Sequence, residues 1–216
     1  MKVKVENYIK KIGQDSVLNN ITLEFESGKI YGLKGKNGSG KTMIMRAVCG
    51  LIRPTSGRVI IDGEEIGKNI SFPRSVGALI ENPGFLNNLT GYQNLKILSD
   101  IKQIITSDQI VETIKKVGLD PNDKRKVKKY SLGMRQKLGI AAAIMENPEL
   151  VILDEPTNAL DQESKERLHH ILQELKSKGT LIILASHDRD ELESLCDSIY
   201  VIEDGIVKES YQCDLK

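Results

Sequence analysis

A glycine-rich segment ending in Lys-Thr constrains the fold of this chain more than any other feature. Residues 35–42 read Gly-Lys-Asn-Gly-Ser-Gly-Lys-Thr and fit the pattern G-x-x-x-x-G-K-[ST]. An apolar run at residues 30–33 precedes the segment, and residues 43–49 have the composition of a helix. The pattern therefore predicts a strand, a phosphate-binding loop and a helix, in that order.

The residue types of this segment suit the binding of a polyphosphate. Glycines let successive N–H groups turn toward an anion, and a helix N-terminus adds partial positive charge there. A lysine supplies charge for the β- and γ-phosphates, and a threonine hydroxyl is a ligand for Mg²⁺. The residues predicted to bind the nucleotide are Gly35, Lys36, Asn37, Gly38, Ser39, Gly40, Lys41 and Thr42, the last also as a metal ligand.

Two other interpretations of the segment are weak. A chance match to the pattern in a chain of ordinary glycine content is on the order of one per cent. The dinucleotide-binding pattern G-x-G-x-x-G fails, because Met43 stands where the third glycine is needed. The phosphate-binding loop therefore remains the preferred interpretation.

Composition limits the class of protein. The 216 residues suffice for one large domain, and the formal net charge of +1 does not favour a nucleic-acid partner. No apolar run approaches the roughly 20 residues needed to span a bilayer, and the N-terminus lacks the apolar region of a signal peptide. The three cysteines are far apart, which indicates reduced thiols in a cytosolic protein.

Alternating strands and helices predict an α/β fold with a mostly parallel sheet. The expected strands lie in residues 1–34 (antiparallel, with a turn at 14–16), 58–66 (a hairpin turned at 62–63), 76–80, 150–153, 180–185 and 199–208 (a hairpin turned at 204–205). The runs at 150–153 and 180–185 are wholly apolar, which is typical of strands covered on both faces.

A helical period dominates from about residue 90 to 145. Helices are expected at 92–98, after a cap at Ser107, and from Ser131 to residue 145, and two more at 162–178 and 191–196. We expect a single domain over 1–216. In it, residues 1–84 and 146–216 form a P-loop NTPase core with an antiparallel β subdomain, and residues 85–145 form an inserted α-helical subdomain.

Polar side chains follow the apolar strands. Asp154 and Glu155 end one strand, where α/β sheets build ligand sites. In P-loop NTPases an acidic residue at this place holds Mg²⁺, so we assign that role to Asp154 and the role of general base to Glu155. His187 ends the next strand, and its convergence with the other two strand ends favours contact with a γ-phosphate. The alternative for Asp154 and Glu155 is an ordinary turn at the end of a strand. The alternative for His187 is a solvated or capping residue.

Further motifs then reveal a family resemblance. Residues 130–136 read Tyr-Ser-Leu-Gly-Met-Arg-Gln, residues 150–161 read Leu-Val-Ile-Leu-Asp-Glu-Pro-Thr-Asn-Ala-Leu-Asp, and residues 186–188 read Ser-His-Asp. With the glycine-rich loop, these motifs make residues 3–209 resemble the nucleotide-binding domain of an ATP-binding cassette (ABC) transporter. The family's signature, Leu-Ser-Gly-Gly-Gln, is kept only at Ser131 and Gly133.

The resemblance implies an activity and partners. It implies an ATPase that converts ATP and water to ADP and phosphate, with Mg²⁺, and that powers a separate transmembrane permease at the cytoplasmic face of the cell membrane. It also implies an ATP-dependent head-to-tail dimer, in which Ser131 and Gly133 contact the γ-phosphate held by the other subunit. Ser131 would cap its helix, whose N-terminus then faces that anion.

Two departures from the family pattern concern the binding site. Ile12 stands where the family usually has an aromatic residue against the adenine, so the resemblance assigns Ile12 to the nucleotide site. Tyr8 is the nearest aromatic residue, but its strand parity indicates a packing role. Glu81 stands where the family usually has a glutamine that reaches the Mg²⁺ and the attacking water, so Glu81 is expected to serve both catalysis and metal binding. Glu81, the loop after it and the signature variant resemble the subgroup that exports bacitracin and lantibiotic-type peptides.

Alternatives remain open for the partner. A regulatory ABC ATPase that signals through a membrane complex, without moving a solute, would share every motif. A soluble ABC protein of translation or DNA repair would need tandem domains or long coiled coils, which the sequence lacks. The lysine-rich run at residues 124–129 is interpreted as a solvated loop, with attraction to acidic lipid head groups as the second interpretation.

Overall fold

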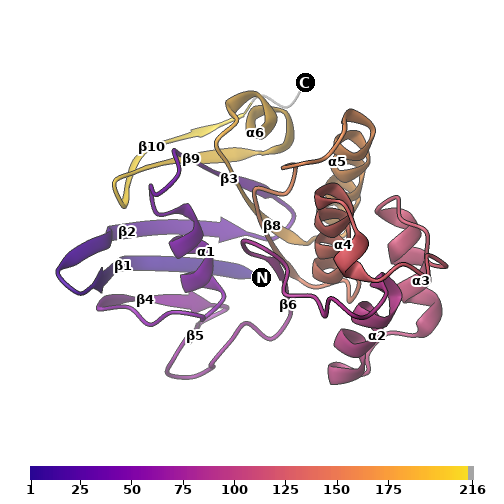
Figure 1. The fold of residues 1–216 in the computed structure, drawn as a ribbon. Coiled ribbons are helices and arrows are strands. Elements are labelled where there is room, and N and C mark those ends of the chain that lie inside the picture. The colour runs from indigo at the N-terminus through magenta and orange to yellow at the C-terminus, as the bar shows by residue number, and fades with distance from the viewer. Residues whose placement is uncertain (214–216) are drawn as a thin grey trace.

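Two sheets and a group of helices make up the chain, as described for residues 1–213 by a computed structural model (Figure 1). The six-stranded sheet has the order β10-β9-β3-β8-β7-β6, and the four-stranded sheet has the order β2-β1-β4-β5. The six strands are β3 (Ile30–Lys34), β6 (Val76–Leu79), β7 (Leu150–Asp154), β8 (Leu181–Ser186), β9 (Ser198–Glu203) and β10 (Ile206–Gln212). The four are β1 (Lys2–Ile12), β2 (Asp15–Glu26), β4 (Ser56–Ile61) and β5 (Glu64–Glu65).

The six-stranded sheet is parallel except at one edge. Strands β6, β7, β8, β3 and β9 pair in parallel, and β10 pairs antiparallel to β9. The predicted α/β fold with a mostly parallel sheet is therefore confirmed. Because β3, β8 and β7 are neighbours with parallel register, the segments that follow their carboxyl ends meet at one edge of the sheet.

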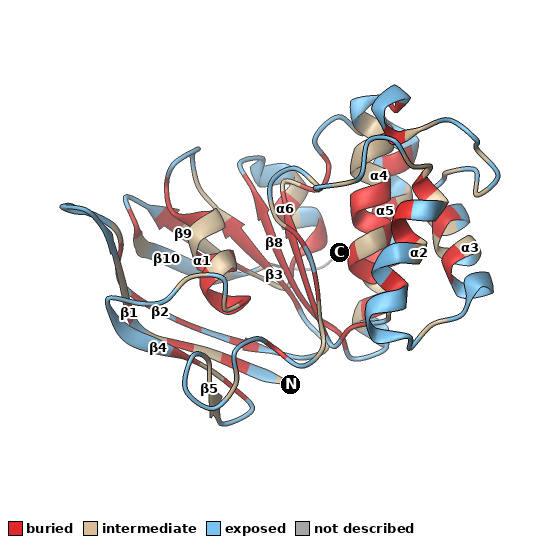
Figure 2. Cartoon of the chain, turned by 60° about the horizontal axis from the view of Figure 1, so that its bottom comes forward, coloured by how far each residue is buried: buried red, intermediate tan, exposed pale blue. Residues whose placement is uncertain are grey.

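The apolar strands of this sheet are buried on both faces (Figure 2). Successive side chains alternate between two cores: Leu150 and Ile152 of β7 face one, and Val151 and Leu153 face the other. The first core lies between the two sheets and contains helix α1 (Lys41–Val48). The second core lies under the remaining helices. This two-sided burial explains why the predicted strand at 150–153 contains no polar residue.

The antiparallel strands β1 and β2 were also predicted, with one turn misplaced, whereas β3, expected among the antiparallel strands of residues 1–34, pairs in parallel with β8 and β9. Ile12 pairs with Asp15, so the first turn lies at residues 13–14, where Gly13 has a φ of 62°. Asp15 was expected in the turn, but it begins β2. The chain reverses one residue earlier than expected because Gly13 adopts this positive φ without strain. The hairpins at Asp62-Gly63 and Asp204-Gly205 are confirmed. Both residues of each turn have positive φ, as two-residue hairpin turns require.

The helices are α2 (Gly91–Lys102), α3 (Ser107–Lys116), α4 (Leu132–Ile144), α5 (Gln162–Ser177) and α6 (Arg189–Leu195), with a 3₁₀ turn at Val127–Lys129. Helices α2, α3 and α4 gather at one side of the fold and derive from residues 91–144 (Figure 1). Within the described residues 1–213, no helix combines the length and apolar character needed to cross a membrane.

Helix ends differ from prediction where caps decide them. Thr90 and Gln93 form a capping box, so α2 starts before residue 92, and it continues past residue 98 to Lys102. The expected cap at Ser107 is wrong, because Thr106 accepts the hydrogen bond from the Gln109 backbone and Ser107 is the first helical residue. The expected cap at Ser131 is confirmed, since its hydroxyl accepts from the Met134 backbone at 3.2 Å.

Candidate active site

The glycine-rich loop connects β3 to α1, which is the predicted strand–loop–helix order. Gly40 is the N-cap of α1 and offers no side-chain hydrogen bond to the helix, so the first-turn N–H groups stay available to an anion. Gly40 has a φ of 110°, and a Cβ there would lie 2.9 Å from Leu18. Both facts explain the need for glycine at this position.

Lys41 is buried at the base of this loop. Its ammonium group donates to the carbonyl oxygens of Gly35 at 2.6 Å and Lys36 at 3.1 Å. Burial lowers the pKa of Lys41, whereas the nearby carboxylates of Glu155 and Asp154 act in the opposite direction. The loop therefore holds one positive charge in a fixed place, facing two carboxylates.

Ser39 offers a further group to a phosphate. Its hydroxyl is buried and has no hydrogen-bond partner within residues 1–213. A Cβ at Gly35 would lie 2.5 Å from that hydroxyl, so the glycine keeps the space open. An unpaired buried hydroxyl beside a fixed ammonium and free helical N–H groups fits the oxygens of a polyphosphate.

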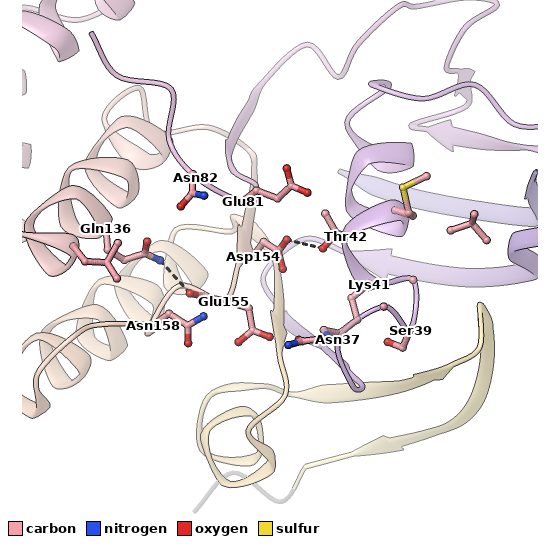
Figure 3. A pocket seen from close by; sticks show the side chains of 15 residues that line it. Asn37, Ser39, Lys41, Thr42, Glu81, Asn82, Gln136, Asp154, Glu155 and Asn158 are labelled. Carbon is pink, nitrogen blue, oxygen red and sulfur yellow. Dashed lines mark hydrogen bonds between the residues drawn. The ribbon is translucent and has the colours of Figure 1, made fainter. Parts of the chain in front are cut away.

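The carboxylates end β7, next to the loop. Thr42 of α1 donates its hydroxyl hydrogen bond to Asp154 Oδ2 at 2.7 Å, across 112 positions of sequence (Figure 3). Asp154 is buried, and Glu155 beside it is partly exposed. The Nδ1 atom of His187 lies 3.0 Å from Glu155 Oε2. The structure thus brings together Thr42, Asp154, Glu155 and His187, as the convergence of three strand ends predicts.

The oxygens of Thr42 and Asp154 fit a magnesium ion. Mg²⁺ prefers oxygen ligands and is commonly held by one or two protein groups together with water and substrate phosphates. The described part of the chain contains no cluster of three or more His, Cys, Asp or Glu side chains able to hold a metal. A hydroxyl and a carboxylate beside a phosphate pocket therefore suit an ion that arrives with a nucleotide.

A cavity of about 550 Å³ lies between the glycine-rich loop and the carboxylates that end β7 (Figure 3). Its lining includes most of the predicted phosphate-binding residues, Asp154, Glu155 and Glu81. The sequence did not single out six other lining residues: Val17, Met43, Asn82, Leu132, Gln136 and Asn158. Four of them, Asn82, Leu132, Gln136 and Asn158, lie inside the stretches that carry the family resemblance, which was the available signal.

Gln136 links helix α4 to the segment that follows β7. Its side-chain amide donates to the carbonyl oxygen of Glu155 at 3.0 Å (Figure 3) and to that of Pro156 at 3.1 Å. Glu155 has a φ of 47°, a left-handed conformation uncommon for residues other than glycine. The hydrogen bonds from α4 therefore meet a backbone segment in an unusual conformation, directly beside the carboxylate at the end of β7.

Glu81 lies at the rim of the cavity. Its carboxylate forms an ion pair with Arg46 of α1, at 2.8 Å between Oε2 and Nη2. The side chain extends toward α1, and Asp154 is drawn below it, also facing Thr42 of α1 (Figure 3). Glu81 is therefore close to the predicted metal ligands, but its charge is directed to a partner that the sequence did not indicate.

Ser131 and Gly133 are placed apart from this chain's own cavity. Neither is among the lining residues, although their neighbour Leu132 is. Leu132 is 64% exposed at the start of α4, in the place of the family's first signature glycine. A Cβ at Gly133 would lie 2.6 Å from the carbonyl oxygen of Ala159, so glycine permits α4 to approach that loop.

Ile12 and Tyr8 occupy different environments. Ile12 is the last residue of β1, is 55% exposed, and is absent from the cavity lining, where Val17 of β2 appears instead. Tyr8 is 1% exposed and donates its hydroxyl hydrogen bond to the Ile52 carbonyl at 3.1 Å. The packing role predicted for Tyr8 is confirmed, so this ring is not available for stacking on a base.

We expect weak discrimination between ATP and GTP. Stacking of a base on an aromatic side chain contributes about 1–3 kcal/mol, and neither Val17, which lines the cavity, nor Ile12 supplies such a ring. Titration of each nucleotide should give dissociation constants within about ten-fold of each other. Ile12→Tyr should tighten both. A strong preference of the parent protein for ATP would contradict the prediction.

Comparison with protein families supports the resemblance. A family model described as "ABC transporter" matches residues 18–158. An uncharacterised ABC transporter ATP-binding protein of Bacillus subtilis, YybJ, is 48% identical over 96% of this chain and 95% of its own length. The lantibiotic transport ATP-binding protein SrtF of Streptococcus pyogenes is 40% identical (94% and 87% covered). The bacitracin transport ATP-binding protein BcrA of Enterococcus faecalis is 42% identical (94% and 67% covered).

Solved structures have the same fold. The structure of an ATP-binding subunit of an ABC transporter matches with a TM-score of 0.90 and 25% identity, over 99% of this chain and 91% of the other. A dimeric cassette, MJ0796, in a post-hydrolysis state with ADP and phosphate, matches with a TM-score of 0.88 and 24% identity, over 97% and 98%. The predicted core architecture is therefore that of ATP-binding cassettes.

Proposed function

Since this chain belongs to the ABC transporter family and is an ATPase of the cassette type, we propose that it powers a separate membrane permease that exports peptide antibiotics or protects the cell against them. The observation that carries the catalytic part is the joining of Lys41, Thr42, Asp154 and Glu155 in one cavity. The printed names of SrtF and BcrA support the antibiotic class.

We assign roles in hydrolysis from these contacts. Lys41, the Ser39 hydroxyl and the loop N–H groups bind the phosphates. Glu155 accepts a proton from the attacking water, whose oxygen bonds to the γ-phosphorus while the bond to ADP breaks. His187 contacts Glu155 from the neighbouring strand end, and we assign it to the γ-phosphate. Thr42, Asp154 and, with its side chain turned inward, Glu81 would hold Mg²⁺, which would supply charge neutralisation at the phosphates.

The proposed working unit is a dimer with a second ATP-binding domain. Ser131 and Gly133 stand away from their own chain's phosphate cavity, at the exposed N-terminus of a 13-residue helix. A helix N-terminus favours an anion, so a head-to-tail partner would complete each phosphate site from its open side. MJ0796, which shares the fold, is a dimer.

A groove beside Glu81 is the proposed docking place of the permease. It measures about 300 Å³ and lies between the edge strand β6 and helices α2 and α4. Apolar side chains on its rim are exposed: Leu86, Ile97 and Leu98. Asn82 lines both this groove and the phosphate cavity, so the loop that starts at Glu81 joins the two. A permease segment in the groove would therefore contact the loop nearest the nucleotide.

This function predicts that Glu81→Ala separates ATP hydrolysis from protection. In cells carrying the cognate permease, the variant should bind ATP yet lose most of the protection against the peptide antibiotic, because the loop no longer transmits the nucleotide state. Glu81→Gln should keep much of the basal ATPase activity, since an amide oxygen is also a ligand for Mg²⁺. The measurements are ATPase rate and antibiotic survival, side by side.

The controls decide between the proposed function and its alternative. The chain should first co-purify with a membrane-spanning partner, and vesicles containing both should move the peptide in an ATP-dependent manner. Co-purification without transport would favour a regulatory ABC ATPase that signals through the complex. Full protection by Glu81→Ala would reduce Glu81 to an ordinary loop residue and weaken the link to the antibiotic subgroup.

A further inference from the structure

An ion pair connects the phosphate-binding helix to the loop that leads to the groove. Arg46 of α1 and Glu81 are separated by 35 positions, and their charged atoms lie 2.8 Å apart. Their side chains are 34% and 57% exposed, so the pair stands at the cavity rim and not in the core. An exposed ion pair of this kind adds little to the stability of the fold. Its effect on the position of the Glu81 carboxylate is therefore the more important question.

Helix geometry determines where Arg46 holds that carboxylate. Thr42 and Arg46 are four residues apart on α1, so their side chains lie on one face of the helix, with Cβ atoms roughly 5–6 Å apart. The Thr42 hydroxyl contacts Asp154, whereas Arg46 contacts Glu81 one turn further on. The pair therefore holds the Glu81 carboxylate against Arg46, a residue on the same face of α1 as Thr42.

The backbone of Glu81 contributes to this placement. Its φ is 58°, in the left-handed region that residues with a Cβ seldom adopt. Such a conformation directs the side chain differently from an extended residue continuing β6. The drawn side chain points to the α1 side of the cavity (Figure 3). Backbone and ion pair thus act in the same direction.

A third carboxylate inside this cavity would oppose phosphate binding. Asp154 and Glu155 already face Lys41, and a third negative charge beside them would repel a polyphosphate. We propose that Arg46 is a positioning residue: it balances the charge of Glu81 and holds that carboxylate at the rim, from which it turns inward only once Mg²⁺ and nucleotide are bound. The inference rests on the proposed role of Glu81 in ATP hydrolysis.

A double-mutant cycle tests this role with the full chain. ATP affinity is measured in EDTA, so that no metal masks the carboxylate, for the parent, Arg46→Ala, Glu81→Gln and the double variant. Loss of the arginine charge alone would weaken binding by the same factor in both backgrounds. If Arg46 also restrains Glu81, Arg46→Ala should raise the dissociation constant about five-fold more with Glu81 than with Gln at that position, the effect of one carboxylate moving to the phosphates.

Further variants guard against a purely structural effect. Arg46→Lys should restore most of the affinity, and Arg46→Gln should repeat the result of Arg46→Ala if the alanine variant folds poorly. Arg58→Ala removes an arginine from a comparable pair with Glu6, also 2.8 Å apart, and should leave ATP affinity unchanged. If Arg46→Ala raised the dissociation constant for ATP by the same factor with Glu or Gln at position 81, the positioning role would be overturned. The ATPase assignment would remain intact. A parent chain that binds no ATP would overturn both.

Discussion

Replacing Lys41 with alanine should reduce ATP affinity, or the rate of hydrolysis, by about 100-fold. The ammonium group is buried, and the carbonyl oxygens of Gly35 and Lys36 fix its position beneath the loop. A hydrogen bond to a charged group contributes about 1.5–3 kcal/mol, so the loss of one or two such bonds to phosphate corresponds to this factor. Equilibrium titration with MgATP and a steady-state ATPase assay measure the two quantities.

Two variants separate this effect from general damage. Lys41→Met keeps much of the apolar length of the side chain and should show the same loss, because it lacks the charge. Lys68→Ala removes an exposed lysine from a loop of the antiparallel sheet and should behave like the parent. Thermal unfolding of all three shows whether the loop carbonyls need the ammonium group for stability. Near-normal ATPase activity in Lys41→Ala would contradict the assignment of the phosphate-binding loop.

The predictable part of the fold depends on local patterns. Leu150 to Leu153 is apolar without interruption because each of its faces meets a separate core, so the parallel strand was evident from composition. The Asp-Gly hairpins were evident because few other pairs accept positive φ at both positions. Helix ends were less accurate. Thr106 and Ser107 are both good caps, and only the reciprocal bond with Gln109 selects the first of them.

The candidate site also has a part that the sequence predicted and a part that it did not. Lys41, Thr42, Asp154 and Glu155 lie in motifs whose chemistry is local, and the sheet brings these motifs together. The contacts of Gln136 with the Glu155 carbonyl and of Arg46 with Glu81 join distant segments, and neither changes the local residue pattern. Such contacts depend on the three-dimensional course of the chain, so residue spacing in the sequence does not predict them.

Glu155→Gln should slow ATP hydrolysis by about 10²–10⁴-fold while MgATP binding persists. The carboxylate accepts a proton from water, and an amide of the same shape is a poor base. Thr42, Asp154 and Lys41 are unchanged in the variant, so the contacts assigned to the phosphates and Mg²⁺ remain. Because the proposed dimer depends on bound ATP, a variant that retains its ATP should accumulate as a dimer. Light scattering with and without MgATP measures this, beside a single-turnover hydrolysis assay.

The matched control for this variant is Glu163→Gln. It makes the same chemical change at a side chain that is 82% exposed on α5 and paired with Arg167 at 3.1 Å, so hydrolysis and association should match the parent. Slow hydrolysis of Glu155→Gln without dimer formation would keep the base and reject the proposed dimer. Normal hydrolysis would move the base elsewhere, and His187 would be the first candidate, because its Nδ1 atom lies 3.0 Å from the Glu155 carboxylate. His187→Ala would then abolish the activity that Glu155→Gln retains.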